Sequence, residues 1–226
     1  MEREPSLRDR LIDVGVDLVM TEGSAALGLR EIARRAGVSH GAPRRYFPTH
    51  HSLLSAIARR GFADLASRIE AAIRPTSGPT ADGARTPREQ AHAIGRAYVG
   101  YALECRGMFE LMFRHDLLDS DKAALRGEQD TTGRPRLRES TLPLFELLVG
   151  LVARCRPERG DQRGPDTPAA VTAAALWSNL HGLAQLWAWG SLQLVLPAAP
   201  SDDDRLEELD RLVAAVLDAH LGPADA

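Results

Sequence analysis

The chain has 226 residues, a formal net charge of -3, 44% hydrophobic residues and 26% charged residues. This composition is typical of a globular protein with enough apolar material for one large or two small domains. Its apolar runs are shorter than the roughly 18 residues that a membrane span needs, and its amino terminus lacks the apolar segment of a signal peptide. These features argue against membrane and secreted proteins, and we expect a cytoplasmic location.

Apolar residues recur at helical spacing along most of the chain, and no segment alternates like a strand. Capping residues, glycines and prolines mark where the helices begin and end. The predicted helices span residues 6–21, 29–36, 40–47, 49–73, 87–105, 108–118, 136–155, 167–196 and 201–221, and the longest polar segments between them are 74–85, 119–134 and 156–166. The sequence therefore predicts an all-α fold.

Two short predicted helices near the amino terminus carry the most informative pattern. Gly37 ends the first, because glycine tolerates the left-handed backbone common at that point, and Ser39 is a good N-cap for the second. Two short helices joined by such a turn are typical of a helix-turn-helix. Residues 29–51 hold five arginines and one acid, a local charge of +4. A basic segment in an otherwise acidic chain indicates a nucleic-acid contact.

Residues 29–39, Leu-Arg-Glu-Ile-Ala-Arg-Arg-Ala-Gly-Val-Ser, and then His-Gly-Ala-Pro-Arg-Arg-Tyr-Phe-Pro at 40–48, resemble the tetracycline-repressor (TetR) family of regulators. The resemblance is specific over about residues 6–60. It implies an amino-terminal three-helix helix-turn-helix domain at 1–52. It also implies a larger helical bundle at 53–226 that binds an effector and dimerises. Three departures stand out: Gly28 where Thr is common, Pro43-Arg44 in place of an apolar-Tyr pair, and Ser52 in place of a capping-box Glu.

Arg44 and Arg45 are the strongest candidates for DNA contact, because a guanidinium pairs with guanine O6 and N7 or holds phosphate. Neighbours on a helix diverge by about 100°, so we expect one to read bases and the other to hold phosphate. The family pattern implies phosphate contact for Tyr46, and the start of the fourth helix suits a phosphate. The alternative is a solvated basic face. The full predicted set is Arg30, Ser39, His40, Gly41, Arg44, Arg45, Tyr46, His50 and His51.

Trp177, His181 and Gly182 form a Trp-x-x-x-His-Gly arrangement that resembles a carboxy-terminal subgroup of the family. Trp177 and His181 are one turn apart and share a helix face. We expect them to line an apolar effector pocket with a few polar groups, although a packed core histidine is an equally good interpretation. The predicted pocket residues are Phe62, Tyr98, Tyr101, Phe109, Met112, Phe113, Phe145, Trp177 and His181.

The resemblance places the dimer interface on the last two helices. Small residues on one face of the helix at 167–196 suit the close approach of a second subunit, and the last helix adds an apolar stripe. The predicted interface residues are Ala174, Ser178, Gly182, Gln185, Leu209, Val213 and Val216.

The chain lacks the familiar motifs of metalloproteases, phosphate-binding loops and serine hydrolases, and its two cysteines lack zinc-ligand spacing. We therefore expect no enzyme, cofactor or metal. The predicted function is a homodimeric regulator, a repressor that binds an inverted-repeat operator in double-stranded DNA and is released by a small hydrophobic effector. Two alternatives remain open: an all-α ligand-binding or catalytic protein with a vestigial DNA-binding domain, and a regulator without a small-molecule effector.

Overall fold

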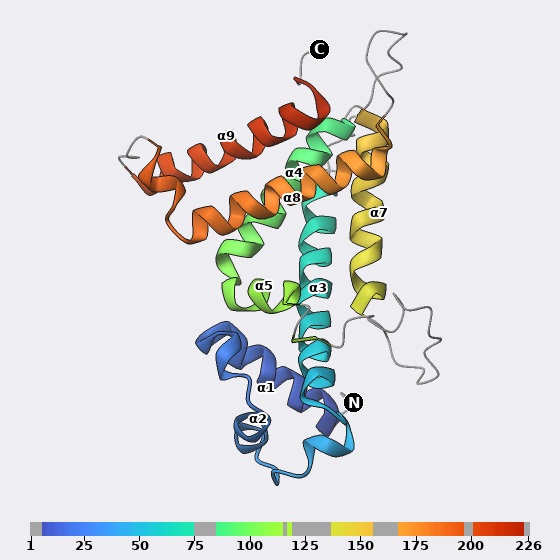
Figure 1. The fold of residues 1–226 in the computed structure, drawn as a ribbon, viewed down its shortest axis with the longest axis vertical. Helices are drawn as coiled ribbons and strands as arrows, with labels where there is room; N and C mark the ends of the chain where they lie inside the picture. Colours follow the sequence, from blue (N-terminus) through green and yellow to red (C-terminus); the bar gives the residue numbers. More distant parts are fainter. Residues whose placement is uncertain are drawn as a thin grey trace, which may run out of the picture. The chain divides into compact units, whose positions relative to one another are not determined.

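The computed structural model describes residues 6–74, 85–114, 117–118, 137–155, 167–196 and 201–223. Over these residues it contains eight α-helices and no β-strand (Figure 1), so the all-α prediction is confirmed. The α-helices are α1 (Leu7–Glu22), α2 (Leu29–Arg35), α3 (His50–Ile73), α4 (Pro87–Glu104), α5 (Arg106–Phe113), α7 (Leu137–Cys155), α8 (Ala169–Ala188) and α9 (Asp202–Leu221). Three short 3₁₀ helices are η1 (Ser24–Ala26), η2 (Pro43–Arg45) and η3 (Leu192–Leu194). The three long polar segments predicted as loops lie outside the described residues, apart from Arg74 and Arg85.

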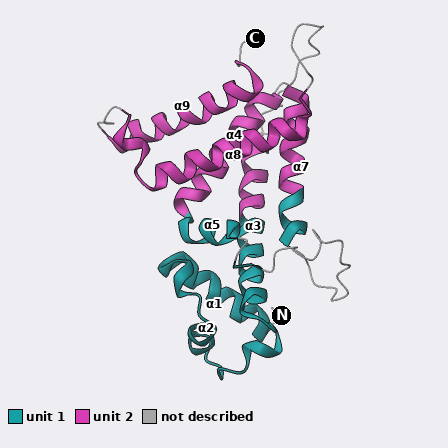
Figure 2. Ribbon diagram, in the orientation of Figure 1, with its two compact units in different colours: residues 1–64, 105–142 teal, residues 65–104, 143–226 magenta. Residues whose placement is uncertain are grey.

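The chain forms two compact units, which Figure 2 shows in different colours. The N-terminal unit comprises residues 1–64 and 105–142, and the C-terminal unit comprises residues 65–104 and 143–226. Helix α3 contributes its first part to one unit and its last part to the other. The domain boundary that we place at residue 52 stays a prediction. No helix among the described residues has the length and apolar character needed to cross a membrane.

The N-terminal unit is held together by apolar side chains and by close approach of helices at two glycines. Leu11, Ile32 and Ile57 are completely buried. A Cβ atom added to Gly15 would lie 2.3 Å from Cδ1 of Ile57, and one added to Gly107 would lie 2.2 Å from the carbonyl oxygen of Val19. Only glycine fits at the crossing of α1 with α5, where the clash is with the backbone, and a larger residue at the crossing of α1 with α3 would force the Ile57 side chain to move.

The start of α3 is fixed by a reciprocal pair of hydrogen bonds. The Ser52 amide donates to Oγ1 of Thr49 at 2.9 Å, and the Thr49 amide donates to Oγ of Ser52 at 3.2 Å. Ser52 thus completes the capping box that a glutamate usually completes, so its departure from the family pattern leaves the cap intact. Gly28, by contrast, gives α2 an N-cap without a side-chain hydrogen bond.

The prediction of an α-helix over residues 40–47 is wrong. Only Pro43–Arg45 form a helical turn, the 3₁₀ helix η2, and the amides of Ala42, Arg45 and Tyr46 each donate to the carbonyl three residues back. Two features of the sequence explain this: Pro43 has no amide proton to donate to residue 39, and Gly41 favours an irregular backbone. No hydrogen bond from the Ser39 side chain caps this segment.

The C-terminal unit packs α4, α8 and α9 against one another. A Cβ atom on Gly95 of α4 would lie 2.9 Å from Cγ1 of Val213 of α9 and 3.7 Å from Cδ2 of Leu180 of α8. The three helices therefore meet around this glycine. Ser201 caps α9 as predicted, because its hydroxyl accepts from the Asp204 amide at 3.2 Å, and Gly222, with φ of 85°, follows its end.

Several helix ends differ from the prediction. Helix α8 ends at Ala188 rather than near residue 196, because Gly190 adopts a φ of 76° and the amides of Gly190 and Ser191 donate to the carbonyls of Trp187 and Leu186. This pair of bonds is a Schellman motif, which stops a helix at a left-handed glycine. Pro168 is the N-cap of α8 rather than its first residue. The break between α4 and α5 falls at Cys105, and α5 ends at Phe113 instead of residue 118.

Candidate functional site

The turn that follows α2 is also built by a Schellman motif at a left-handed glycine. Gly37 has a φ of 68°, and the amides of Gly37 and Val38 donate to the carbonyls of Arg34 and Ala33. The Arg10 guanidinium of α1 donates to the Ala36 carbonyl at 2.8 Å, which satisfies another oxygen at the end of α2. These contacts fix the direction in which the chain leaves α2.

The far end of the turn is held by buried and stacked groups. Pro43 is buried, Phe47 is 3% exposed, and the Arg8 guanidinium lies 5.6 Å from the centre of the Phe47 ring. The His50 ring, at the start of α3, hydrogen-bonds through Nε2 to the Leu27 carbonyl. The segment between α2 and α3 is thus anchored at both ends.

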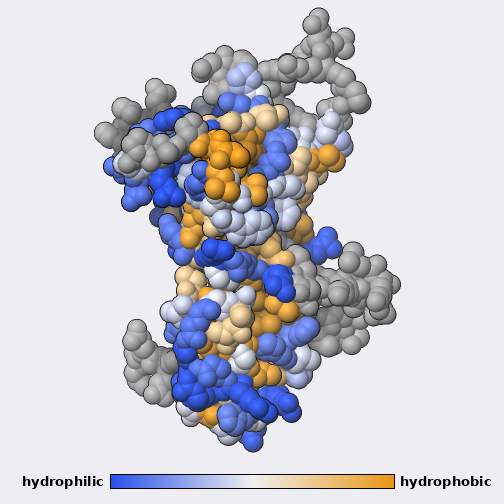
Figure 3. Space-filling model, turned by 60° about the vertical axis from the view of Figure 1, so that its left-hand side comes forward, coloured by the Kyte–Doolittle hydropathy of each residue, from blue (hydrophilic) through white to orange (hydrophobic). Residues whose placement is uncertain are grey.

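The side chains between these anchors face solvent. Ser39, His40, Gly41, Arg44, Arg45 and Tyr46 are all exposed, as are Arg30 on α2 and His51 on α3. Within the described part of the chain, Arg30, Arg44 and Arg45 have no ion-pair partner. Figure 3 shows a strongly hydrophilic surface, in blue, over this end of the N-terminal unit. In a 3₁₀ helix with three residues per turn, Arg44 and Arg45 diverge by about 120°, so their side chains leave the backbone in different directions.

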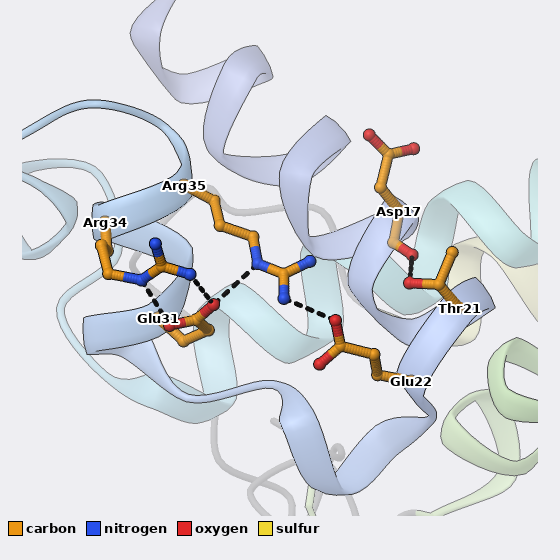
Figure 4. Close-up of polar contacts among 6 residues, drawn as sticks. All are labelled: Asp17, Thr21, Glu22, Glu31, Arg34 and Arg35. Atoms are coloured by element: carbon orange, nitrogen blue, oxygen red, sulfur yellow. Dashed lines mark hydrogen bonds and ion pairs between the residues drawn. The ribbon is translucent and has the colours of Figure 1, made fainter.

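Two other arginines of the basic segment are occupied. The Arg34 guanidinium forms a fork with Glu31, with Nε 2.9 Å from Oε2 and Nη2 2.6 Å from Oε1 (Figure 4). Arg35 donates from Nε to Glu31 at 2.7 Å and from Nη2 to Glu22 at 2.5 Å. The hydrogen bonds from Arg34 and Arg35 lower the pKa of Glu31 to about 2. The unneutralised charge of the segment therefore rests on Arg30, Arg44 and Arg45.

The sequence indicates part of this cluster of ion pairs. Glu31 stands three residues before Arg34 and four before Arg35, the spacings at which helical side chains meet. Glu22, which completes the cluster, belongs to α1 and could not be assigned from spacing.

The predicted pocket residues fall in both units. In the N-terminal unit, Phe113 packs edge-on against Phe62 and Phe109, with ring centres 5.7 and 4.9 Å away, and Met112 is fully buried. In the C-terminal unit, Tyr101 is buried beneath the Arg68 guanidinium, which lies 5.0 Å from its ring centre, and Phe145 is partly buried.

Three of the predicted pocket residues form a hydrogen-bonded group between α4 and α8, here called the polar triad: Tyr98, Trp177 and His181. Trp177 Nε1 donates to the Tyr98 hydroxyl at 2.9 Å, and that hydroxyl lies 2.9 Å from Nδ1 of His181. Tyr98 is 6% exposed, and its burial raises the pKa of the phenol; burial also lowers the pKa of His181. The shared face that the sequence predicts for Trp177 and His181 is confirmed by their common partner.

The predicted interface residues differ in exposure. On α8, Ser178 is exposed, Ala174, Gly182 and Gln185 are partly exposed, and a Cβ atom on Gly182 would meet nothing within 4 Å. On α9, Leu209 and Val213 are buried within their own unit, whereas Val216 is partly exposed. The small-residue face of α8 is therefore open along part of its length.

Two parts of the chain match known protein families. Residues 11–57 match the bacterial regulatory proteins of the tetR family, and residues 91–220 match the tetracyclin repressor-like C-terminal domain. The HTH-type transcriptional regulator BetI of Rhizobium meliloti (strain 1021) is 33% identical over 93 residues, which are 41% of this chain and 42% of that protein. The aligned region thus spans less than half the length of this relative.

Two solved structures from Rhodococcus sp. RHA1 share the fold. A protein with unknown function has a TM-score of 0.66 and 26% identity, over 97% of this chain and 95% of that chain. A TetR-like transcriptional regulator has a TM-score of 0.55 and 18% identity, over 93% of this chain and 96% of that chain.

An anchored basic turn between two helices, carried on an all-α scaffold, defines a DNA-binding protein of the helix-turn-helix class. The domain matches at both ends of the chain then identify the family. The chain belongs to the TetR family of transcriptional regulators, as the resemblance predicts. The Trp-x-x-x-His-Gly subgroup stays a prediction.

Proposed function

We propose that this regulator is a repressor that binds an inverted-repeat operator as a homodimer and releases it when a small hydrophobic effector binds. The observation that carries the proposal is the anchored turn, on which Arg44, Arg45 and Tyr46 are exposed while Pro43 and Phe47 are buried. Side chains displayed on a fixed backbone are suited to reading a rigid partner.

Arg44 and Arg45 make different contacts with DNA. Because they diverge by about 120° on η2, one faces base edges and the other the phosphate backbone. A bidentate contact to guanine supplies sequence preference, and a phosphate contact supplies affinity for any sequence. Tyr46 and the amides of His50 and His51 add phosphate contacts, since the amides of Thr49 and Ser52 are held in the capping pair.

The homodimer is supported by the open face of α8. Ala174, Ser178 and Gly182 are small, and no described residue lies within 4 Å of a Cβ atom added to Gly182. A two-fold dimer presents two helix-turn-helix segments related by the same symmetry, so its operator is an inverted repeat.

Effector control is supported by the polar triad. It brings together the buried Tyr98, the half-buried His181 and the exposed Trp177, whose hydrogen-bonding groups can orient a largely apolar ligand. An effector that prefers the state unable to bind DNA must bind the DNA complex more weakly by the same factor. Helix α3, which contributes to both units, is the element through which we expect this coupling to run.

Substitution of the two arginines tests the DNA-binding proposal. Arg44→Ala or Arg45→Ala should weaken operator binding by about 1–3 kcal/mol where the residue makes a bidentate base contact. A phosphate contact should instead weaken binding to all sequences and reduce the salt slope by about 0.9 for each bound helix-turn-helix. The measurement is fluorescence anisotropy with an operator selected from genomic fragments, at fixed salt for the affinities and over a range of KCl concentrations for the slope. Arg205→Ala, an exposed arginine on α9, is the matched control. Unchanged binding in both turn variants would remove the basis of the proposal.

A further inference from the structure

The arginines of α2 differ in what their guanidinium groups face. Arg34 is held in a two-point fork by Glu31, and Arg35 bridges Glu31 and Glu22 (Figure 4). Two carboxylates therefore neutralise two guanidinium groups at the surface of the N-terminal unit. Arg30, one turn before Arg34 on the same helix, has no such partner in the described residues.

The ion pair with Glu31 keeps the Arg34 guanidinium from binding other anions. Residues four apart share a helix face, so Arg34 lies on the face of Arg30, the residue we expect to touch phosphate. The Arg34 side chain is 65% exposed, whereas that of Arg35 is 35% exposed and bound to both acids. Of the two paired arginines, Arg34 is thus the one placed to reach DNA.

Glu31 competes with phosphate for the same group. Both anions accept two parallel hydrogen bonds from a guanidinium fork, so Arg34 cannot serve both fully. Movement of Arg34 to a phosphate would also leave the Glu31 carboxylate facing the DNA backbone with one partner fewer. Like charges at short range repel, which favours retention of the Glu31–Arg34 pair.

We propose that Glu31 limits the affinity of the helix-turn-helix for the DNA backbone by keeping Arg34 from phosphate. This inference rests on the proposed DNA-binding function and adds a residue that sets its strength. Because a phosphate contact carries no sequence information, Glu31 lowers binding to operator and random DNA alike. The regulator thereby spends less time on non-specific sites.

Salt titration of a random-sequence duplex tests the proposal. In anisotropy measurements over a range of KCl concentrations, Glu31→Gln should make the slope of log K against log salt steeper by about 0.9 per bound helix-turn-helix, the value for one added phosphate contact. Glu22→Gln removes the same charge from the same cluster but leaves the Arg34 fork intact, so its slope should match the wild type. Glu31→Gln combined with Arg34→Ala should return to the wild-type slope.

Arg34→Ala alone gives an independent readout that does not require the Glu31 variant to fold. It should leave the wild-type slope unchanged, and a flattened slope would show that Arg34 already contacts DNA and overturn the proposal. An unchanged slope in Glu31→Gln, with native circular dichroism, would also overturn it. Wild-type protein with no salt-dependent binding to DNA would instead overturn the proposed function, so the two failures are distinguishable.

Discussion

Both units bring helices together through apolar groups and glycines, and the C-terminal unit in addition places the polar triad between α4 and α8. In the first unit the charged groups form pairs at the surface, such as Arg60 with Asp13 and Arg34 with Glu31. In the second, Tyr98 is buried while its hydroxyl accepts from Trp177 and contacts His181. The N-terminal unit also exposes Arg30, Arg44 and Arg45, which have no ion-pair partner in the described residues and can meet a partner without disturbing the core. In the C-terminal unit, a change at the polar triad would act on the packing of α4 against α8.

The largest expected effect concerns the close helix crossing of the N-terminal unit. Gly107→Ala should lower the free energy of unfolding by about 3 kcal/mol, because the new methyl group would overlap the Val19 carbonyl oxygen, a backbone atom that cannot rotate away. Gly100→Ala on α4 is the control: nothing lies within 4 Å of its Cβ position, so alanine should stabilise that helix by about 0.5–1 kcal/mol. Urea denaturation measures both. Equal stability of the two variants would show that the crossing adapts readily.

A second substitution tests whether the polar triad contributes to stability. Tyr98→Phe removes the hydroxyl that contacts both Trp177 and His181, and it should cost about 2 kcal/mol because two partly buried hydrogen bonds are lost together. Tyr46→Phe, at an exposed tyrosine of the anchored turn, should leave stability unchanged. If both variants have the melting temperature of the wild type, the polar triad is not a structural link between α4 and α8.

The cap of α3 should have an intermediate effect. Thr49→Ala removes the hydroxyl that accepts from the Ser52 amide, and we expect a loss of about 1 kcal/mol in thermal or urea unfolding. Thr49→Ser keeps the hydroxyl and should retain most of that stability. A similar loss in both variants would assign the effect to the threonine methyl group rather than to the capping bond.

The smallest effect is a pH dependence from His181. Burial lowers the pKa of this imidazole in the folded state, so below the ordinary value of about 6.5 the unfolded chain binds the proton more readily. The stability is therefore complete above about pH 6.5 and falls as the pH drops below it. Melting temperatures at several pH values between 5 and 8 should decline less in His181→Gln than in the wild type. Parallel pH profiles would contradict this assignment.

The sequence predicts those parts of the fold that depend on local signals. Helices α1 and α9 begin at serine caps and are followed by glycines, and both are found where the pattern places them. The helix over 40–47 fails because the effect of Pro43 on the backbone hydrogen bonds outweighs the helical spacing of its neighbours. The end of α8 is missed for a similar reason, since the left-handed glycine at 190 stops an otherwise strongly apolar helix.

Contacts between distant segments are not accessible from the pattern. The exposure of Arg44 and Arg45 follows from the motif, but the Arg35–Glu22 pair depends on how α1 packs beside α2. Tyr98 and His181 are separated by 83 residues, and only the packing of α4 on α8 brings them together. The roles of the predicted DNA-binding, pocket and interface residues stay predictions.

The anchored turn between α2 and α3 bears on how such a protein acquires new target sites during evolution. Its stability comes from Pro43, Phe47 and the groups that hold them, while Arg44, Arg45 and Tyr46 form no side-chain hydrogen bond or ion pair in the described residues. Under the proposed function, mutations at these three positions would change recognition with little loss of folding stability. A duplicated gene could drift toward a different operator through single substitutions, each intermediate still folding.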